Sequence, residues 1–149
     1  MKYRIESDFL GEMKIPSDAY YGIHTKRAVD NFPIADVAIS VYPNIVIAYA
    51  MVKLACARAN NKLGLLEDEI YEPIVSACER IINGEFHDQF VVEIIQGGAG
   101  TSTNMNANEV IANVALEIIG REKGDYDAIS PLGHVNMSQS TNDTYPTAL

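Results

Sequence analysis

Residues 96–120 read QGGAGTSTNMNANEVIANVALEIIG, and the rest of the chain is organised around them. Gly97 to Gly100 carries no bulky side chain, so its backbone N–H groups can approach a ligand closely. Three hydroxyl residues, 101–103, follow, and each is of a type that caps a helix. The composition is helical as far as Ile119, and Gly120 is typical of the left-handed residue that ends a helix. The stretch therefore predicts a small-residue loop that leads into a long helix.

The start of this helix is a candidate anion site. Free N–H groups and the positive end of the helix dipole both favour negative charge there. A nucleotide phosphate is disfavoured, because no lysine follows Gly100 and the spacing of the glycines is not GxGxxG. A carboxylate is the better candidate. The alternative is a flexible loop that does no more than start a core helix.

The same helix carries two sets of polar residues. Four of them fall within one narrow sector at about 100° per residue: Asn106, Glu109, Asn113 and Glu117. The expectation for that stripe is a solvated face. Asn104 and Asn108 share a side with apolar residues, so if that side is buried, both amides need partners from neighbouring backbone or from a ligand.

Composition bounds the function. The 149 residues are 48% hydrophobic and 21% charged, as in an ordinary globular domain, and the net charge of −9 argues against nucleic acid or an anionic membrane as partner. No apolar run is long enough to span a bilayer, and charges interrupt the region where a signal peptide would need its apolar core. Cys56 and Cys78 are the only cysteines, with no CxxC and no Cys/His cluster. We expect reduced thiols, no metal site and a cytoplasmic protein.

Before residue 96, the pattern predicts a small hairpin and two helices. Residues 3–15 form two short runs around Leu10-Gly11-Glu12, and Pro16 closes the second run. The first helix spans residues 42–62, and its section Ile45–Ala59 is apolar almost all round, so other elements, even from another chain, should surround it. The second spans residues 67–83, and either starts near Pro73 or kinks there. Residues 85–95 look extended.

Two polar segments remain open to two interpretations. Arg27 lies in a segment of mixed pattern, where it is either an exposed side chain or a carboxylate ligand. Residues 138–142, Ser-Gln-Ser-Thr-Asn, are either a solvated loop or a convergent set of donors. Residues 143–149 then read as an N-cap and the first turn of another helix, so we expect the chain to be a piece of a longer protein.

The sequence resembles the N-terminal domain of the aspartase/class II fumarase superfamily, with the aspartate ammonia-lyase branch nearer. Four segments carry the resemblance: DAYYGIHTKRAVDNF (18–32), DQF (88–90), QGGAGTSTNMNANEVIAN (96–113) and HVNMSQSTNDTYPTA (134–148). The resemblance implies an almost wholly helical subunit of three domains and a homotetramer built on a central helix bundle. Residues 1–149 would be the first domain, and the helix-bundle and C-terminal domains would be absent from this chain.

The resemblance also implies the chemistry and its residues. Each active site would draw on three subunits, with the catalytic serine on a mobile loop outside residues 1–149, so no catalytic residue is expected here. Thr101, Ser140, Thr141 and Asn142 match the family's substrate-binding residues. Asn104 and Arg27 are weaker candidates. The implied reaction is the reversible deamination of L-aspartate to fumarate and ammonia, with no cofactor.

Two other functions stay open. The first is that of a class II fumarase, or of a lyase acting on a related dicarboxylate. Against it, fumarases tend to have a hydroxyl residue at position 97, and this chain has Ser130-Pro131-Leu132-Gly133 in place of the His-Pro-Asn-Asp of a second dicarboxylate site. The other function is a non-catalytic assembly domain that acts through Ile45–Ala59.

Overall fold

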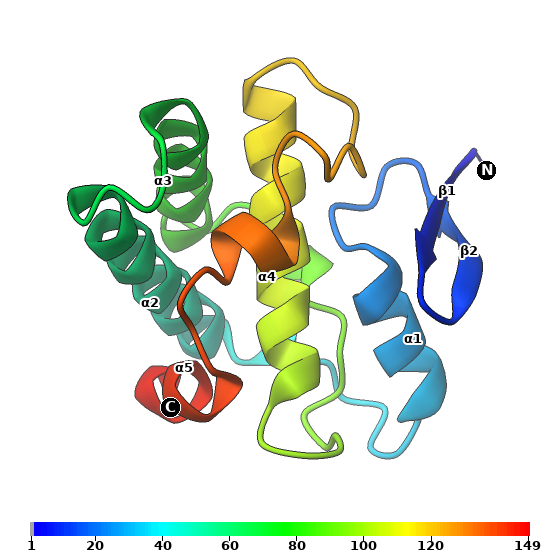
Figure 1. Ribbon diagram of the computed structural model, residues 1–149. Coiled ribbons are helices and arrows are strands. Elements are labelled where there is room, and N and C mark those ends of the chain that lie inside the picture. Colours follow the sequence, from blue (N-terminus) through cyan, green and yellow to red (C-terminus); the bar gives the residue numbers. More distant parts are fainter. Residues whose placement is uncertain (1) are drawn as a thin grey trace.

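Helix α4 (Thr101–Ile118) lies at the centre of the computed structural model, which describes residues 2–149 (Figure 1). From Thr103 to Leu116 every residue of α4 except Met105 is buried. Helix α1 contacts it on one side, α3 on the other, and α5 and η3 also contact it. A helix covered in this way forms the core around which the remaining elements pack.

The chain is mainly helical with one antiparallel hairpin, which confirms the predicted fold class. Figure 1 shows the hairpin and α1 together on one side of α4, and α2 and α3 on the other. The elements in order are β1 (Tyr3–Asp8), β2 (Gly11–Pro16), α1 (Ile23–Asn31), the 3₁₀ turn η1 (Ile39–Val41), α2 (Pro43–Lys62), α3 (Asp68–Ile82), the 3₁₀ turn η2 (His87–Gln89), α4, the π-helical turn η3 (Pro131–Val135) and α5 (Thr141–Ala148).

The predicted hairpin and the two predicted helices are present. β1 and β2 pair from Tyr3 with Pro16 to Asp8 with Gly11. Pro73 lies within α3 and not at its start, because the helix already begins at Asp68. The extended segment predicted at residues 85–95 is only partly right. η2 lies in its first half, whereas residues 90–94 form backbone hydrogen bonds with residues 37–40, around the bridge between Glu93 and Ala38.

Both ends of α4 are capped by groups near them in the sequence. Gly120 has a φ of +73° and its N–H donates to the Glu117 carbonyl, as the sequence predicts. At the other end the residue before the helix is Gly100, with a φ of +86° and no side-chain cap. The expectation that a hydroxyl caps the helix is wrong, because Gln96 takes that place: its Oε1 accepts from the Thr103 N–H at 3.0 Å and its Nε2 donates to the Thr103 hydroxyl at 2.7 Å.

The polar stripe of α4 is buried, which corrects the expectation of a solvated face. Asn106, Glu109 and Asn113 are fully buried, and only Glu117 is exposed. Loops cover the stripe, and their backbone groups need partners once water is excluded. The Asn113 amide donates to the Tyr20 carbonyl at 2.8 Å and accepts from the Gly124 N–H at 2.8 Å. Polar side chains on α4 thus complete the hydrogen bonding of the loops.

Glu109 caps α1 from a distant part of the sequence. Its carboxylate accepts from the N–H groups of Gly22, His24 and Thr25 at 2.8, 2.8 and 3.0 Å, and from the Thr25 hydroxyl at 2.6 Å. α1 has no side-chain cap from its own N-cap residue, Gly22. Burial raises the pKa of the Glu109 carboxyl, and the bonds from Thr25 and His24 act in the opposite direction. The carboxylate therefore supplies the negative charge that the start of a helix favours.

One face of α2 is open. Val46, Tyr49 and Ala50 are buried against the rest of the domain, whereas Met51 is 52% exposed and Ala55 is also exposed. The sequence predicted that other elements surround this apolar helix, and within residues 2–149 they cover only part of it. That another chain covers this face stays a prediction.

We predict that Glu109→Gln destabilises the domain by about 3 kcal/mol, because the new amide group would face backbone donors in a site without water. The free energy of unfolding in urea is the measurement. Glu117→Gln is the matched control, an exposed carboxylate two turns further along the same stripe. Equal unfolding midpoints for the two variants would contradict the capping role of Glu109.

Candidate functional site

The first part of the candidate site is the start of α4. Thr101 is the first residue of the helix and its side chain is exposed. The loop before it uses the freedom of glycine, since Gly98 and Gly100 have φ values of +74° and +86°. An exposed hydroxyl thus stands beside the N–H groups of a helix N-terminus, as the sequence predicted for an anion site.

The second part is the start of α5. Ser140 is its N-cap, and the Ser140 Oγ accepts from the Asn142 N–H at 3.2 Å. The N-cap is Ser140 and the helix begins at Thr141, so the expectation of an N-cap at residue 143 is wrong by three residues. Ser140 and Asn142 are exposed and Thr141 is half-buried. Residues 138–142 are therefore only partly a loop, because Ser140 caps a helix that begins at Thr141.

The structure brings these two helix starts together. α4 contacts α5, which lies close to the lower end of α4 in Figure 1. Gly100 lies directly against Tyr145: a Cβ on Gly100 would be 2.2 Å from the Tyr145 ring. Three hydroxyls and two helix N-termini thus lie on adjacent segments. Such an arrangement suits the oxygens of a carboxylate.

Beneath these segments lies a lysine that the sequence analysis missed. Lys53 of α2 is fully buried, and its Nζ donates to the side-chain oxygens of Asn104 (2.7 Å), Gln139 (2.8 Å) and Asn136 (3.0 Å). The signal was present, because Lys53 interrupts a helix that has no polar face. A lysine at an apolar position needs either a route to solvent or buried partners.

Asn104 is a structural partner of Lys53 rather than a free ligand. Its Oδ1 accepts from Lys53 and from the Thr144 hydroxyl at 3.2 Å, and its Nδ2 donates to Asn136 Oδ1 at 3.0 Å. Asn108 also donates to that oxygen, at 3.1 Å. Side chains of this chain therefore supply the partners of Asn104, whereas Asn108 is satisfied only through its Nδ2, and its buried Oδ1 has no hydrogen-bond partner among residues 2–149.

No carboxylate of residues 2–149 bonds to the Lys53 ammonium in the structure. Burial lowers its pKa to about 7. The Tyr49 ring lies 5.9 Å from Nζ and offers a weak cation–π contact. The ammonium is thus held by neutral oxygens alone.

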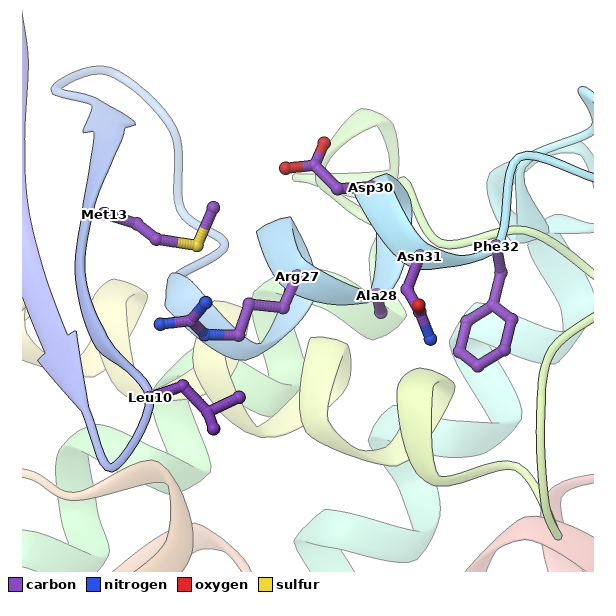
Figure 2. A pocket seen from close by; sticks show the side chains of 7 residues that line it. All are labelled: Leu10, Met13, Arg27, Ala28, Asp30, Asn31 and Phe32. Carbon is purple, nitrogen blue, oxygen red and sulfur yellow. The ribbon is translucent and has the colours of Figure 1, made fainter.

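Arg27 is engaged within its own chain. Its Nε and Nη2 donate to the two carboxylate oxygens of Asp8 at 2.7 and 2.8 Å. This bidentate pair lowers the pKa of Asp8 and ties α1 to the hairpin. Figure 2 shows the Arg27 guanidinium turned toward the hairpin, at the edge of a hollow of about 510 Å³ whose lining includes Met13 and Phe32. None of the other candidate site residues lines this hollow.

The turn at residues 130–133 bonds to itself. The Ser130 Oγ accepts from the Gly133 N–H at 2.9 Å, and the Ser130 N–H donates to His134 Nδ1 at 3.0 Å. Leu132 is 62% exposed. These contacts show a self-contained turn, and the expected absence of a second dicarboxylate site there stays a prediction.

Two features are absent from the part of the chain that the structure describes. Within residues 2–149, no three His, Cys, Asp or Glu side chains cluster in a way that could hold a metal ion. No helix in that range is both long and apolar enough to cross a membrane.

The sequence model of a lyase family matches residues 11–149, and the chain belongs to this family. It is 60% identical over 146 residues to an aspartate ammonia-lyase of Pseudomonas aeruginosa, and 55% identical over 148 residues to that of Bacillus subtilis. These alignments cover 98% and 99% of this chain but 31% of each relative. The chain thus spans about a third of the length of the curated relatives it matches.

Solved structures agree with this membership. A protein from Brucella melitensis described as a fumarate lyase:delta crystallin superposes with a TM-score of 0.97 at 60% identity, covering 99% of this chain and 34% of that one. A class II fumarase from Schistosoma mansoni superposes with a TM-score of 0.90 at 36% identity, covering 99% of this chain and 31% of that one. The mainly helical fold with its N-terminal hairpin is therefore that of fumarase-like lyases.

We predict that Gly100→Ala destabilises the domain more than Gly98→Ala. Both residues have positive φ, so both variants bear a similar backbone cost of about 1 kcal/mol. Only the new methyl at position 100 meets the Tyr145 ring, whereas the nearest atom to a Cβ at position 98 is 4.0 Å away. Overpacking should add about 1–3 kcal/mol for Gly100→Ala, measured by urea unfolding. An equal loss of unfolding free energy in the two variants would contradict this prediction, because it would show that the Tyr145 ring moves aside at no energetic cost.

We predict a pH dependence of stability that is due to Lys53. The unfolded side chain has a pKa near 10.5 and the folded one about 7. Below pH 7 both states hold the proton, and between these values the unfolded chain binds one proton more. The free energy of unfolding should therefore rise with pH relative to Lys53→Met, by up to roughly 5 kcal/mol. Lys62→Met, an exposed lysine on the same helix, should retain the rise, and a rise in Lys53→Met would contradict the assignment.

Proposed function

We propose that this chain is the N-terminal third of an aspartate ammonia-lyase, which converts L-aspartate reversibly to fumarate and ammonia. The observation that carries the proposal is the meeting of the α4 and α5 N-termini, with Thr101, Ser140 and Thr141 on adjacent segments. The identity of 53–60% to several aspartate ammonia-lyases supports the choice of substrate.

The chemistry gives each of these residues a role. Removal of the proton next to the β-carboxylate of aspartate builds an enediolate with extra negative charge on that carboxylate. Hydroxyl and N–H donors already aimed at those oxygens stabilise this charge as it forms, and one such donor contributes about 3 kcal/mol. We assign Thr101, Ser140 and Thr141 to the β-carboxylate, and Asn142 to the region of the leaving amino group. Ammonia then departs, and fumarate remains.

The remaining parts of the active site belong to other segments. Thr101, Ser140 and Asn142 are exposed in this chain, which agrees with a site that other domains and subunits complete. We propose a three-domain subunit with the catalytic serine outside residues 1–149, a cytoplasmic homotetramer, and chemistry without a metal or organic cofactor. The open face of α2 around Met51 is a surface suited to assembly.

The fumarase-like fold is also compatible with a second activity, the hydration of fumarate. A class II fumarase would bind the same dicarboxylate product and add water instead of ammonia. The 36% identity to the Schistosoma mansoni enzyme, against 60% to the Pseudomonas aeruginosa lyase, favours the ammonia-lyase. A third possibility, a helical assembly domain without catalysis, predicts that the complete protein turns over neither substrate.

The test is ammonia release from L-aspartate by the complete protein, beside hydration of fumarate. We predict release of ammonia, and turnover slowed by about two to three orders of magnitude in Thr101→Ala, because one donor to the developing charge is lost. Thr147→Ala is the control: it removes an exposed hydroxyl of α5 that bonds only to the Asp143 carbonyl, and should leave turnover unchanged. Hydration of fumarate without ammonia release would replace the proposed substrate by malate.

A further inference from the structure

We propose that Lys53 is a positioning residue of the dicarboxylate site, whose ammonium holds the turn Asn136–Gln139 against α4 so that Ser140 and Thr141 stay beside Thr101. This inference rests on the proposed function and adds a residue to it that lies beneath the substrate-binding surface.

Lys53 connects the elements that carry the candidate site. Its ammonium joins three separate parts of the chain: its own helix α2, Asn104 of α4, and the turn that bears Asn136 and Gln139. Asn104 is one helical turn from Thr101, and Gln139 directly precedes Ser140. The three hydrogen bonds of one ammonium thus link α4, which carries Thr101, to the turn that precedes Ser140.

The turn at residues 136–139 needs an anchor. Ser138, in its middle, has a φ of +59°, a left-handed conformation that costs about 1 kcal/mol in a residue with a side chain. Bonds within the turn fix its shape: Gln139 Nε2 donates to the Val135 carbonyl at 2.9 Å, and Asn136 Nδ2 donates to the Gln139 carbonyl at 3.2 Å. The bonds to Lys53 add attachment to α2 and α4.

The chemical identity of residue 53 also favours a positioning role. The position is fully buried, and an apolar side chain of similar length would fill it without the cost of removing a charge from water. An ammonium has three donors, and each meets one amide oxygen at 2.7–3.0 Å. A methionine would leave all three oxygens without this donor, and the turn would lose its link to α2.

The experiment uses the complete protein and four variants: Lys53→Met, Gln139→Met, the double variant, and the control Lys62→Met. Lys62 is exposed on the same helix. kcat and KM for L-aspartate are measured below pH 7, where folded Lys53 holds its proton, on protein whose assembly has been checked by light scattering. We expect each single variant to lose about 10–100-fold in kcat/KM, mostly in kcat, because misplaced donors weaken the transition state more than the ground state.

The double variant separates positioning from general stability. Lys53 and Gln139 are the two ends of one link, so the double variant should be about as active as the poorer single variant. Additive losses, or wild-type kcat/KM in assembled Lys53→Met, would overturn the inference. If Lys53→Met does not assemble, then wild-type kinetics in Gln139→Met overturns it instead. A wild-type protein that releases no ammonia and hydrates no fumarate would overturn the proposed function itself.

Discussion

The structure depends on one constraint: a central helix is buried together with its polar side chains, so these side chains need hydrogen-bond partners. Among residues 2–149, the Oδ1 of Asn108 is the buried side-chain atom left without one. Glu109 satisfies this constraint by capping α1. Asn113 does so by hydrogen bonding to the Tyr20 carbonyl and the Gly124 N–H. These contacts place the hairpin side of the domain on α4. The same constraint acts on the opposite side, where Asn104 bonds to Lys53 and Thr144.

The site follows from this packing. α4 is fixed along its length, so its first residue, Thr101, has a defined place at one end of the core. The start of α5 reaches that place because Tyr145 rests on Gly100, where no side chain intervenes. The site's donors therefore stand on a rigid frame although their own side chains face solvent.

The sequence predicted the parts of the fold that depend on local pattern. The hairpin, α2, α3 and the end of α4 at Gly120 all follow from turn residues and apolar spacing. The polar stripe was misread, because helical periodicity identifies a face but not what covers it. The capping by Gln96 and the role of Lys53 were missed for a related reason: each depends on a partner that only the folded chain brings near. The candidate substrate-binding residues came from the family resemblance, since no spacing along the chain places residues 101 and 140 together.

The bonds of Glu109 have a consequence for how the domain folds. They join residues 84 to 87 positions apart in the sequence. If α4 became buried before residues 22–25 packed against it, the Glu109 carboxylate would be enclosed without hydrogen-bond donors, which is unfavourable in free energy. The core and the N-terminal segment are therefore expected to form in one cooperative step. A nascent chain has both partners of this step only after residue 109 has left the ribosome.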